Sequence, residues 1–141
     1  MRYKNIPICI DFDGTCTTHN FPEVGKDIGA QRVLKRLVDE GALLILFTMR
    51  SDGRKDGSNP LTEAVNWFKK NDIPLWGINR NPTQDEWTSS PKAYGHLFID
   101  DAALGAPLVR PWQERPYIDW NAVEEMLFGE ESETAIGKHA H

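Results

Sequence analysis

The chain has 141 residues, which fits one ordinary domain with a sizeable hydrophobic core. It has 16 lysine and arginine residues against 21 aspartate and glutamate residues, and the resulting net charge of -5 argues against nonspecific binding to nucleic acids or membrane surfaces. The sequence holds no apolar run near the roughly 20 residues that cross a bilayer, and its first residues lack the apolar stretch of a signal peptide.

The cysteine content and the chain end indicate the compartment and the domain limits. Cys9 and Cys16 are too few for a disulfide framework, so we expect two reduced thiols in a cytoplasmic protein. We find no internal repeat, and we expect residues 1–128 to form a single domain. The polar stretch GEESETAIGKHAH at 129–141 is predicted to be a flexible tail.

The first part of the chain alternates between strand and helix patterns. The apolar stretch 6–11 predicts a strand that is buried on both faces. Apolar residues at helical spacing from Ala30 to Val38 predict a helix that ends at Gly41. The apolar stretch 42–48 then predicts a second buried strand.

The pattern continues through the rest of the chain. Asn59 and Pro60 predict the start of a second helix, because a capping residue is followed by a first-turn proline. Three further apolar stretches predict strands, the last of them short: 74–79, 96–100 and 106–109. A last helix is predicted from about Asp119 to Phe128.

This order of elements predicts a Rossmann-like three-layer α/β/α sandwich, with helices on both faces of an open, mostly parallel sheet. Ligands of such sheets bind beyond the carboxyl ends of the strands. Polar residues follow three of the predicted strands at that edge: Asp11 and Asp13, Thr48, and Asp100 and Asp101. Four carboxylates this close repel each other unless a cation neutralises them, and hard oxygen ligands are typical of Mg²⁺ sites.

The same residues form a set of motifs. DFDGT (11–15), FT (47–48), Lys92 in SPKAYG and DD (100–101) resemble, in order, the four signature motifs of the haloacid dehalogenase superfamily of phosphotransferases. The resemblance covers residues 6 to 105, which is essentially the whole catalytic core of that family. It implies a Mg²⁺-dependent phosphatase that hydrolyses phosphomonoesters through an aspartyl-phosphate intermediate.

The resemblance also implies a role for each matching residue. Asp11 corresponds to the nucleophile and Asp13 to the general acid/base. Thr48 and Lys92 correspond to the residues that hold the transferring phosphoryl oxygens. The implied Mg²⁺ ligands come from four residues: the Asp11 side chain, the main-chain carbonyl of Asp13, and Asp100 with Asp101, of which the direct ligand is left open.

The sequence departs from many relatives because it leaves no room for a separate cap domain. Only the stretch 15–29 separates the first motif from its helix, and only a helix, a strand and two loops fit between Thr48 and Lys92. We therefore expect residues 1–128 to be one capless catalytic domain.

Three other classes of function stay open. A receiver-like domain also groups Asp, Thr and Lys around Mg²⁺, but no single Asp after the third strand corresponds to its phosphoacceptor. A metal-dependent nuclease built on a carboxylate cluster explains the aspartates but not Thr48 and Lys92. A non-catalytic Mg²⁺- or phosphate-binding domain also fits, because a fold does not determine an activity.

One further residue is predicted to contact the substrate. Arg50 lies two residues past Thr48, so we expect its guanidinium to bind an anionic part of the substrate near the reaction centre. We interpret the loop 49–59 as a partial lid in place of the missing cap. The expected substrate is a phosphorylated small molecule or an accessible phosphate on a larger one. We expect no membrane partner and no specific nucleic-acid partner, and a homo-oligomer is left open.

Overall fold

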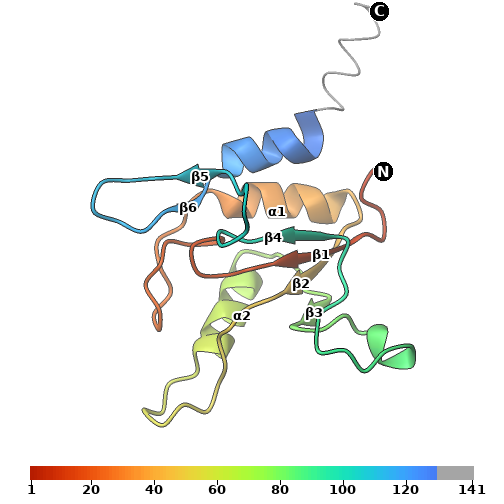
Figure 1. The fold of residues 1–141 in the computed structure, drawn as a ribbon, viewed down its shortest axis with the longest axis horizontal. Coiled ribbons are helices and arrows are strands. Elements are labelled where there is room, and N and C mark those ends of the chain that lie inside the picture. Colours follow the sequence, from red (N-terminus) through yellow and green to blue (C-terminus); the bar gives the residue numbers. More distant parts are fainter. Residues whose placement is uncertain (130–141) are drawn as a thin grey trace, which may run out of the picture.

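The computed structural model describes residues 1–129, so the predicted tail lies outside the described residues beyond Gly129. Its elements follow in chain order (Figure 1): β1 (Pro7–Ile10), α1 (Ala30–Asp39), β2 (Leu43–Leu46), α2 (Pro60–Lys70), β3 (Gly77–Ile78), the 3-10 helix η1 (Gln84–Glu86), β4 (Leu97–Ile99), β5 (Leu108–Val109), β6 (Tyr117–Ile118) and a last helix over 120–129. No helix in this part of the chain is both long and apolar enough to cross a membrane.

Four strands form one parallel sheet in the order β3-β2-β1-β4. The chain runs from β1 outward to β2 and β3, and then returns to the other side of β1 to form β4. The strand order therefore reverses between β1 and β4, which is the point where open α/β sheets bind their ligands. The predicted Rossmann-like α/β fold is confirmed.

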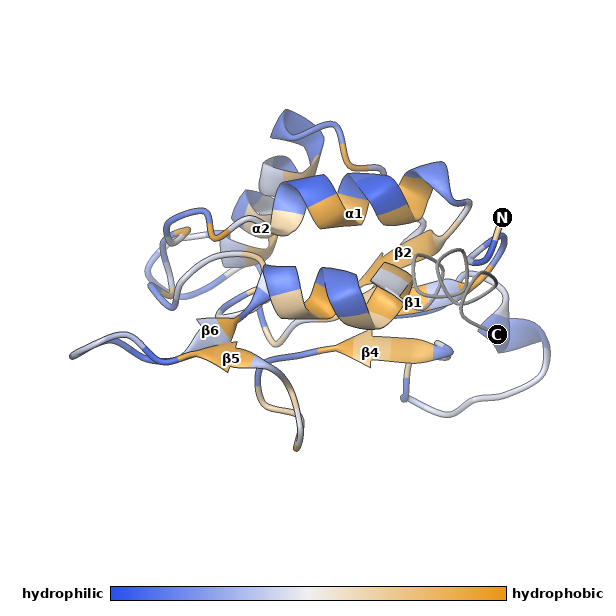
Figure 2. Ribbon diagram, turned by 90° about the horizontal axis from the view of Figure 1, so that it is seen from above, coloured by the Kyte–Doolittle hydropathy of each residue, from blue (hydrophilic) through white to orange (hydrophobic). Residues whose placement is uncertain are grey.

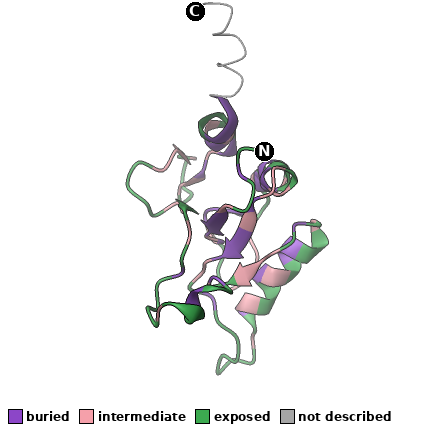
Figure 3. Ribbon diagram, turned by 90° about the vertical axis from the view of Figure 1, so that its right-hand side faces the viewer, coloured by how far each residue is buried: buried purple, intermediate pink, exposed green. Residues whose placement is uncertain are grey.

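The three helices pack on the same face of this sheet. They share one core with Ile8 and Ile10 of β1, to which they contribute Leu34, Phe68 and Phe128. Figure 2 shows α1 and α2 on one side of the strands, and Figure 3 shows that the buried residues are concentrated where helices and sheet meet. All four residues of β1 are buried, as predicted for a strand covered on both faces.

The opposite face of the sheet has a thinner cover. Because successive strand residues point to opposite faces, Cys9 lies on this side, where it packs with Ile45 and Ala93. Ala93 belongs to the segment 79–96, which joins β3 to β4 and carries η1. The sequence predicted helices on both faces, but here a 3-10 turn stands in the place of a longer helix, because two prolines interrupt this segment.

The predicted fifth strand lies outside the main sheet. β5 pairs antiparallel with β6, which the sequence did not predict, to form a separate two-stranded sheet (Figure 1). The Ile118 N–H of β6 donates a hydrogen bond to the Gly14 carbonyl at 2.9 Å. The hairpin is thereby attached to the loop that follows β1, and that loop carries several of the predicted site residues.

Candidate functional site

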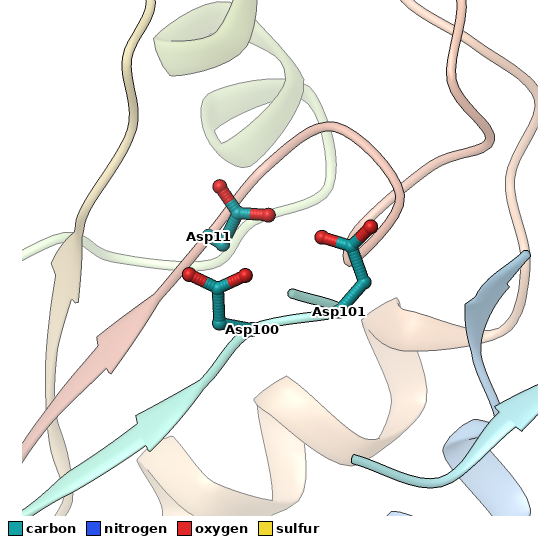
Figure 4. Close-up of side chains that lie close together, drawn as sticks. All are labelled: Asp11, Asp100 and Asp101. Atoms are coloured by element: carbon teal, nitrogen blue, oxygen red, sulfur yellow. The ribbon is translucent and has the colours of Figure 1, made fainter. Parts of the chain in front are cut away.

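Three carboxylates meet where the strand order reverses. Asp11 follows β1, while Asp100 and Asp101 follow β4, and an oxygen from each of the three lies within 4.8 Å of the others. Figure 4 shows the three carboxylates converging from the ends of the two strands. The Asp11 N–H donates to the Ile99 carbonyl at 3.0 Å, so continued strand pairing is what brings the two ends level. The structure thus brings together the aspartates that the sequence placed at this edge.

The electrostatics of this cluster favour a bound cation. The pKa of Asp11 is raised to about 8, first by burial and then by the hydrogen bond with Asp101 and the charge of Asp100, whereas the Thr15 hydrogen bond acts in the opposite direction. An opposite charge nearby favours the ionised form of a carboxylate. Three half-buried carboxylates offer the hard oxygen ligands that Mg²⁺ takes in proteins, so these residues fit the predicted metal.

The loop after β1 supplies two contacts to the cluster that were absent from the predicted site. The Thr15 hydroxyl donates to Asp11 Oδ2 at 2.9 Å and accepts from the Asp101 N–H at 3.1 Å. His19 Nε2 lies 2.9 Å from Asp101 Oδ2. Thr15 belongs to the DFDGT motif and was within reach of sequence reasoning. His19 lies in an irregular loop and carries no sequence signal of its own.

Two features hold this loop in place. Gly14 has a φ of +77°, and a Cβ at this position would collide with the His19 ring and the Asp101 carboxylate. Glycine is therefore needed both for the left-handed conformation and for the close approach. From the other side, Trp120 Nε1 of the last helix donates to the Thr15 carbonyl at 2.6 Å, and both residues are buried. The last helix thus helps to position the loop that contacts the carboxylate cluster.

The Asp13 side chain turns toward Arg50. Arg50 Nε donates to Asp13 Oδ2 at 2.8 Å, and Nη2 donates to Asp13 Oδ1 at 2.7 Å. The remaining three N–H groups of Arg50 donate to the main-chain carbonyls of Pro22, Glu23 and Pro60. All five donors of Arg50 are therefore engaged within the chain, and its side chain is only 1% exposed. The predicted contact of Arg50 with substrate stays a prediction. The carbonyl of Asp13 stays a predicted metal ligand.

Thr48 sits at the carboxyl end of β2, beside this pair. Its N–H donates to Asn79 Oδ1 at 2.8 Å, and its hydroxyl accepts from the Arg50 N–H at 3.1 Å. The first contact ties the ends of β2 and β3 together, and the second orients the hydroxyl. The structure thus places Thr48 at the edge of the sheet that also carries Asp11, where the sequence predicted it.

Lys92 reaches the sheet from the segment 79–96. Its side chain is exposed, its ammonium group lies 5.8 Å from the centre of the Phe98 ring, and it forms no ion pair with any described residue. Phe98 of β4 pairs with Cys9 of β1 in the sheet. Phe98 lies two residues before Asp100, and Cys9 lies two residues before Asp11. Because alternate strand residues share a face, Lys92 approaches the side of the sheet from which these carboxylates extend. Its contact with phosphate stays a prediction.

We predict that His19 supports metal binding by holding Asp101. Groups that hold metal-binding carboxylates typically contribute 10- to 100-fold to affinity, so His19→Ala should weaken Mg²⁺ binding by about that factor. His19→Gln, whose amide nitrogen replaces Nε2, should retain most of the affinity. Mg²⁺ titration followed by calorimetry measures both. The matched control is His96→Ala, because His96 is exposed and precedes β4 at the opposite end of that strand. Equal affinity of His19→Ala and the wild type would contradict the assignment.

Comparisons with known proteins give a structural relative. The chain matches no protein-family model and no curated protein. Among solved structures it is similar to a conserved protein coded by a locus of Bacteroides thetaiotaomicron, with a TM-score of 0.69 and 29% sequence identity. The similarity covers 90% of this chain and 93% of that chain. The two proteins therefore share a fold along nearly their whole length.

Proposed function

We propose that this protein is a Mg²⁺-dependent phosphatase of the haloacid dehalogenase type, which hydrolyses phosphomonoesters. The observation that carries the proposal is the convergence of Asp11, Asp100 and Asp101 within 4.8 Å at the ends of β1 and β4. The motif resemblance adds that Asp11 is followed two residues later by a second carboxylate, as that chemistry requires.

The reaction uses the chain's own groups in two stages. The Asp11 carboxylate attacks phosphorus and the bond to the leaving oxygen breaks, which produces an aspartyl phosphate. Asp13 supplies a proton to the leaving oxygen and then takes one from the water that hydrolyses this intermediate. When bound, Mg²⁺ supplies positive charge that neutralises the carboxylates and the phosphoryl oxygens.

Other residues position these groups. The Thr15 hydroxyl fixes the orientation of the Asp11 carboxylate through its 2.9 Å hydrogen bond. Thr48 and Lys92 hold phosphoryl oxygens in the proposal. Thr48 is supported by its place at the end of β2, and Lys92 is supported by its approach over Phe98. The loop 49–59 acts as a partial lid over the site in place of a cap domain.

The substrate and setting follow from the same residues. Residues 1–129 form the four-stranded sheet, the small β5–β6 sheet and their connections, and they contain no cap domain. This supports a substrate as small as a phosphorylated metabolite or as large as a macromolecule with an accessible phosphate. Cys9 and Cys16 are both free and buried, which supports a cytoplasmic setting.

A comparison of two chromogenic substrates tests this function. With Mg²⁺ present, the protein should hydrolyse 4-nitrophenyl phosphate, lose that activity in EDTA and regain it when excess Mg²⁺ is added. Bis(4-nitrophenyl) phosphate should remain intact, because a dedicated monoesterase positions a terminal phosphate. Turnover of the diester would favour the nuclease. Absence of turnover with 4-nitrophenyl phosphate and with a panel of phosphorylated metabolites would contradict the phosphatase.

A further inference from the structure

Arg50 forms an unusually complete set of bonds for a residue beside a candidate site. The whole residue is 3% exposed. Its guanidinium donates five hydrogen bonds, two to the Asp13 carboxylate and three to main-chain carbonyls. The two contacts with Asp13 are parallel, at 2.8 Å and 2.7 Å, so the pair is bidentate. A bidentate pair fixes the direction of a carboxylate as well as its distance.

The three carbonyl contacts connect segments that are distant in the sequence. Pro22 and Glu23 belong to the loop that follows β1, and Pro60 begins α2. The guanidinium carbon also lies 4.9 Å from the centre of the Phe12 ring and 5.3 Å from that of Phe21. Arg50 is therefore held from several directions, so it can act as a fixed support for Asp13.

We infer that Arg50 is a positioning residue, which holds the Asp13 carboxylate in one orientation and ties that orientation to the 22–23 turn and the start of α2. The inference rests on the proposed function to the extent that Asp13 is the general acid/base. A lysine at this position cannot reproduce the geometry, because its single ammonium group replaces neither the parallel pair nor the three carbonyl contacts.

The first test compares two substrates that differ in leaving group. Phenyl phosphate releases a more basic oxygen than 4-nitrophenyl phosphate, so its hydrolysis depends more on proton donation by Asp13. We expect Arg50→Lys to lower kcat about 100-fold on phenyl phosphate, because small misplacements of catalytic groups cost rates of that order. The loss on 4-nitrophenyl phosphate should be smaller, and KM should change by less than about threefold on both substrates.

A double-mutant comparison shows whether Arg50 acts through Asp13. The double variant Arg50→Lys/Asp13→Asn should be no slower than Asp13→Asn alone, because the residue that Arg50 positions is already disabled. The matched control is Arg32→Lys, which changes an exposed arginine of α1, paired with Glu124, and should stay near wild-type rates. A raised KM with unchanged kcat, equal losses on both substrates, or multiplied losses in the double variant would each overturn the inference.

A second readout needs no activity. Urea unfolding of wild type, both single variants and the double variant should show that the two substitutions are coupled by at least about fivefold in the unfolding equilibrium constant. If Arg50→Lys does not fold, Arg50→Gln and Arg50→Gln/Asp13→Asn replace it, and recovery of folding in the double variant is then the expected coupling. If the wild type hydrolyses no phosphomonoester, the proposed function fails. The coupling measured by unfolding then still shows whether Arg50 and Asp13 act as a pair. Coupling below about twofold overturns the inference in either case.

Discussion

Asp11→Asn is expected to abolish hydrolysis of phosphomonoesters while the protein remains folded. An amide in place of the carboxylate cannot attack phosphorus, so kcat should fall about a thousandfold or more. The fold should tolerate the change, because it removes one of three carboxylates that repel each other in the metal-free state. The shape of the side chain and the oxygen that accepts from Thr15 are both retained. Initial rates on 4-nitrophenyl phosphate, together with thermal unfolding followed by circular dichroism, measure the two effects.

The control for this substitution is Asp39→Asn. Asp39 is the last residue of α1 and is exposed, so the same chemical change there should leave both rate and unfolding temperature near wild type. Residual activity of Asp11→Asn above a tenth of the wild-type rate would show that the reaction does not proceed through a phosphorylated Asp11.

Asp13→Asn and Asp100→Asn are expected to separate catalysis from metal binding. Asp13→Asn should lower kcat by about 10²- to 10⁴-fold, the usual contribution of a general acid/base. It should leave Mg²⁺ binding largely unchanged, because its side chain pairs with Arg50 and lies apart from the carboxylate cluster. Asp100→Asn should weaken Mg²⁺ binding about tenfold or more, with partial recovery of activity at high Mg²⁺. The Asn oxygen can still accept from the Ala102 N–H, so the local turn is preserved.

Thermal unfolding with and without Mg²⁺ distinguishes the two variants. Saturation to about 100 times Kd adds roughly 2.7 kcal/mol to the wild type, which raises its unfolding temperature by several degrees. That rise should persist in Asp13→Asn, although its metal-free unfolding temperature falls because Arg50 is left buried without its charged partner. It should be reduced in Asp100→Asn at the same Mg²⁺ concentration. Asp101→Asn in the same series identifies the more direct ligand. Equal loss of the Mg²⁺ effect in the Asp13 and Asp100 variants would contradict the separate roles.

The helices and strands were predictable because their signals are local. In α1, the apolar spacing that predicted the helix is carried by five residues: Ala30, Val33, Leu34 and Leu37 are buried, and Val38 is partly buried. In α2, Pro60 is the first helical residue, as its place after Asn59 indicated. The third strand was predicted too long, because an edge strand pairs on one side and Pro74 has no N–H to donate.

The convergence of Asp11 with Asp100 and Asp101 was also predictable, because parallel strands place their carboxyl ends at one edge. The direction in which each nearby side chain points was not predictable in the same way. Arg50 was expected near the site from its distance to Thr48, and it lies there. Whether it faces substrate or Asp13 depends on carbonyls at 22, 23 and 60, which only the folded chain brings together.

By itself, the sequence determined the α/β class and the edge of the sheet at which the aspartates gather, because hydrophobic periodicity and strand ends are written into short stretches of chain. The tertiary structure decided the partners: Arg50 with Asp13, His19 with Asp101, and Trp120 with the Thr15 carbonyl. It also decided that β5 and β6 pair with each other, apart from the main sheet. Each of the three side-chain contacts joins loops or elements far apart in sequence. A hydrogen bond between such groups exists only once the packing of the core has set their distance and direction.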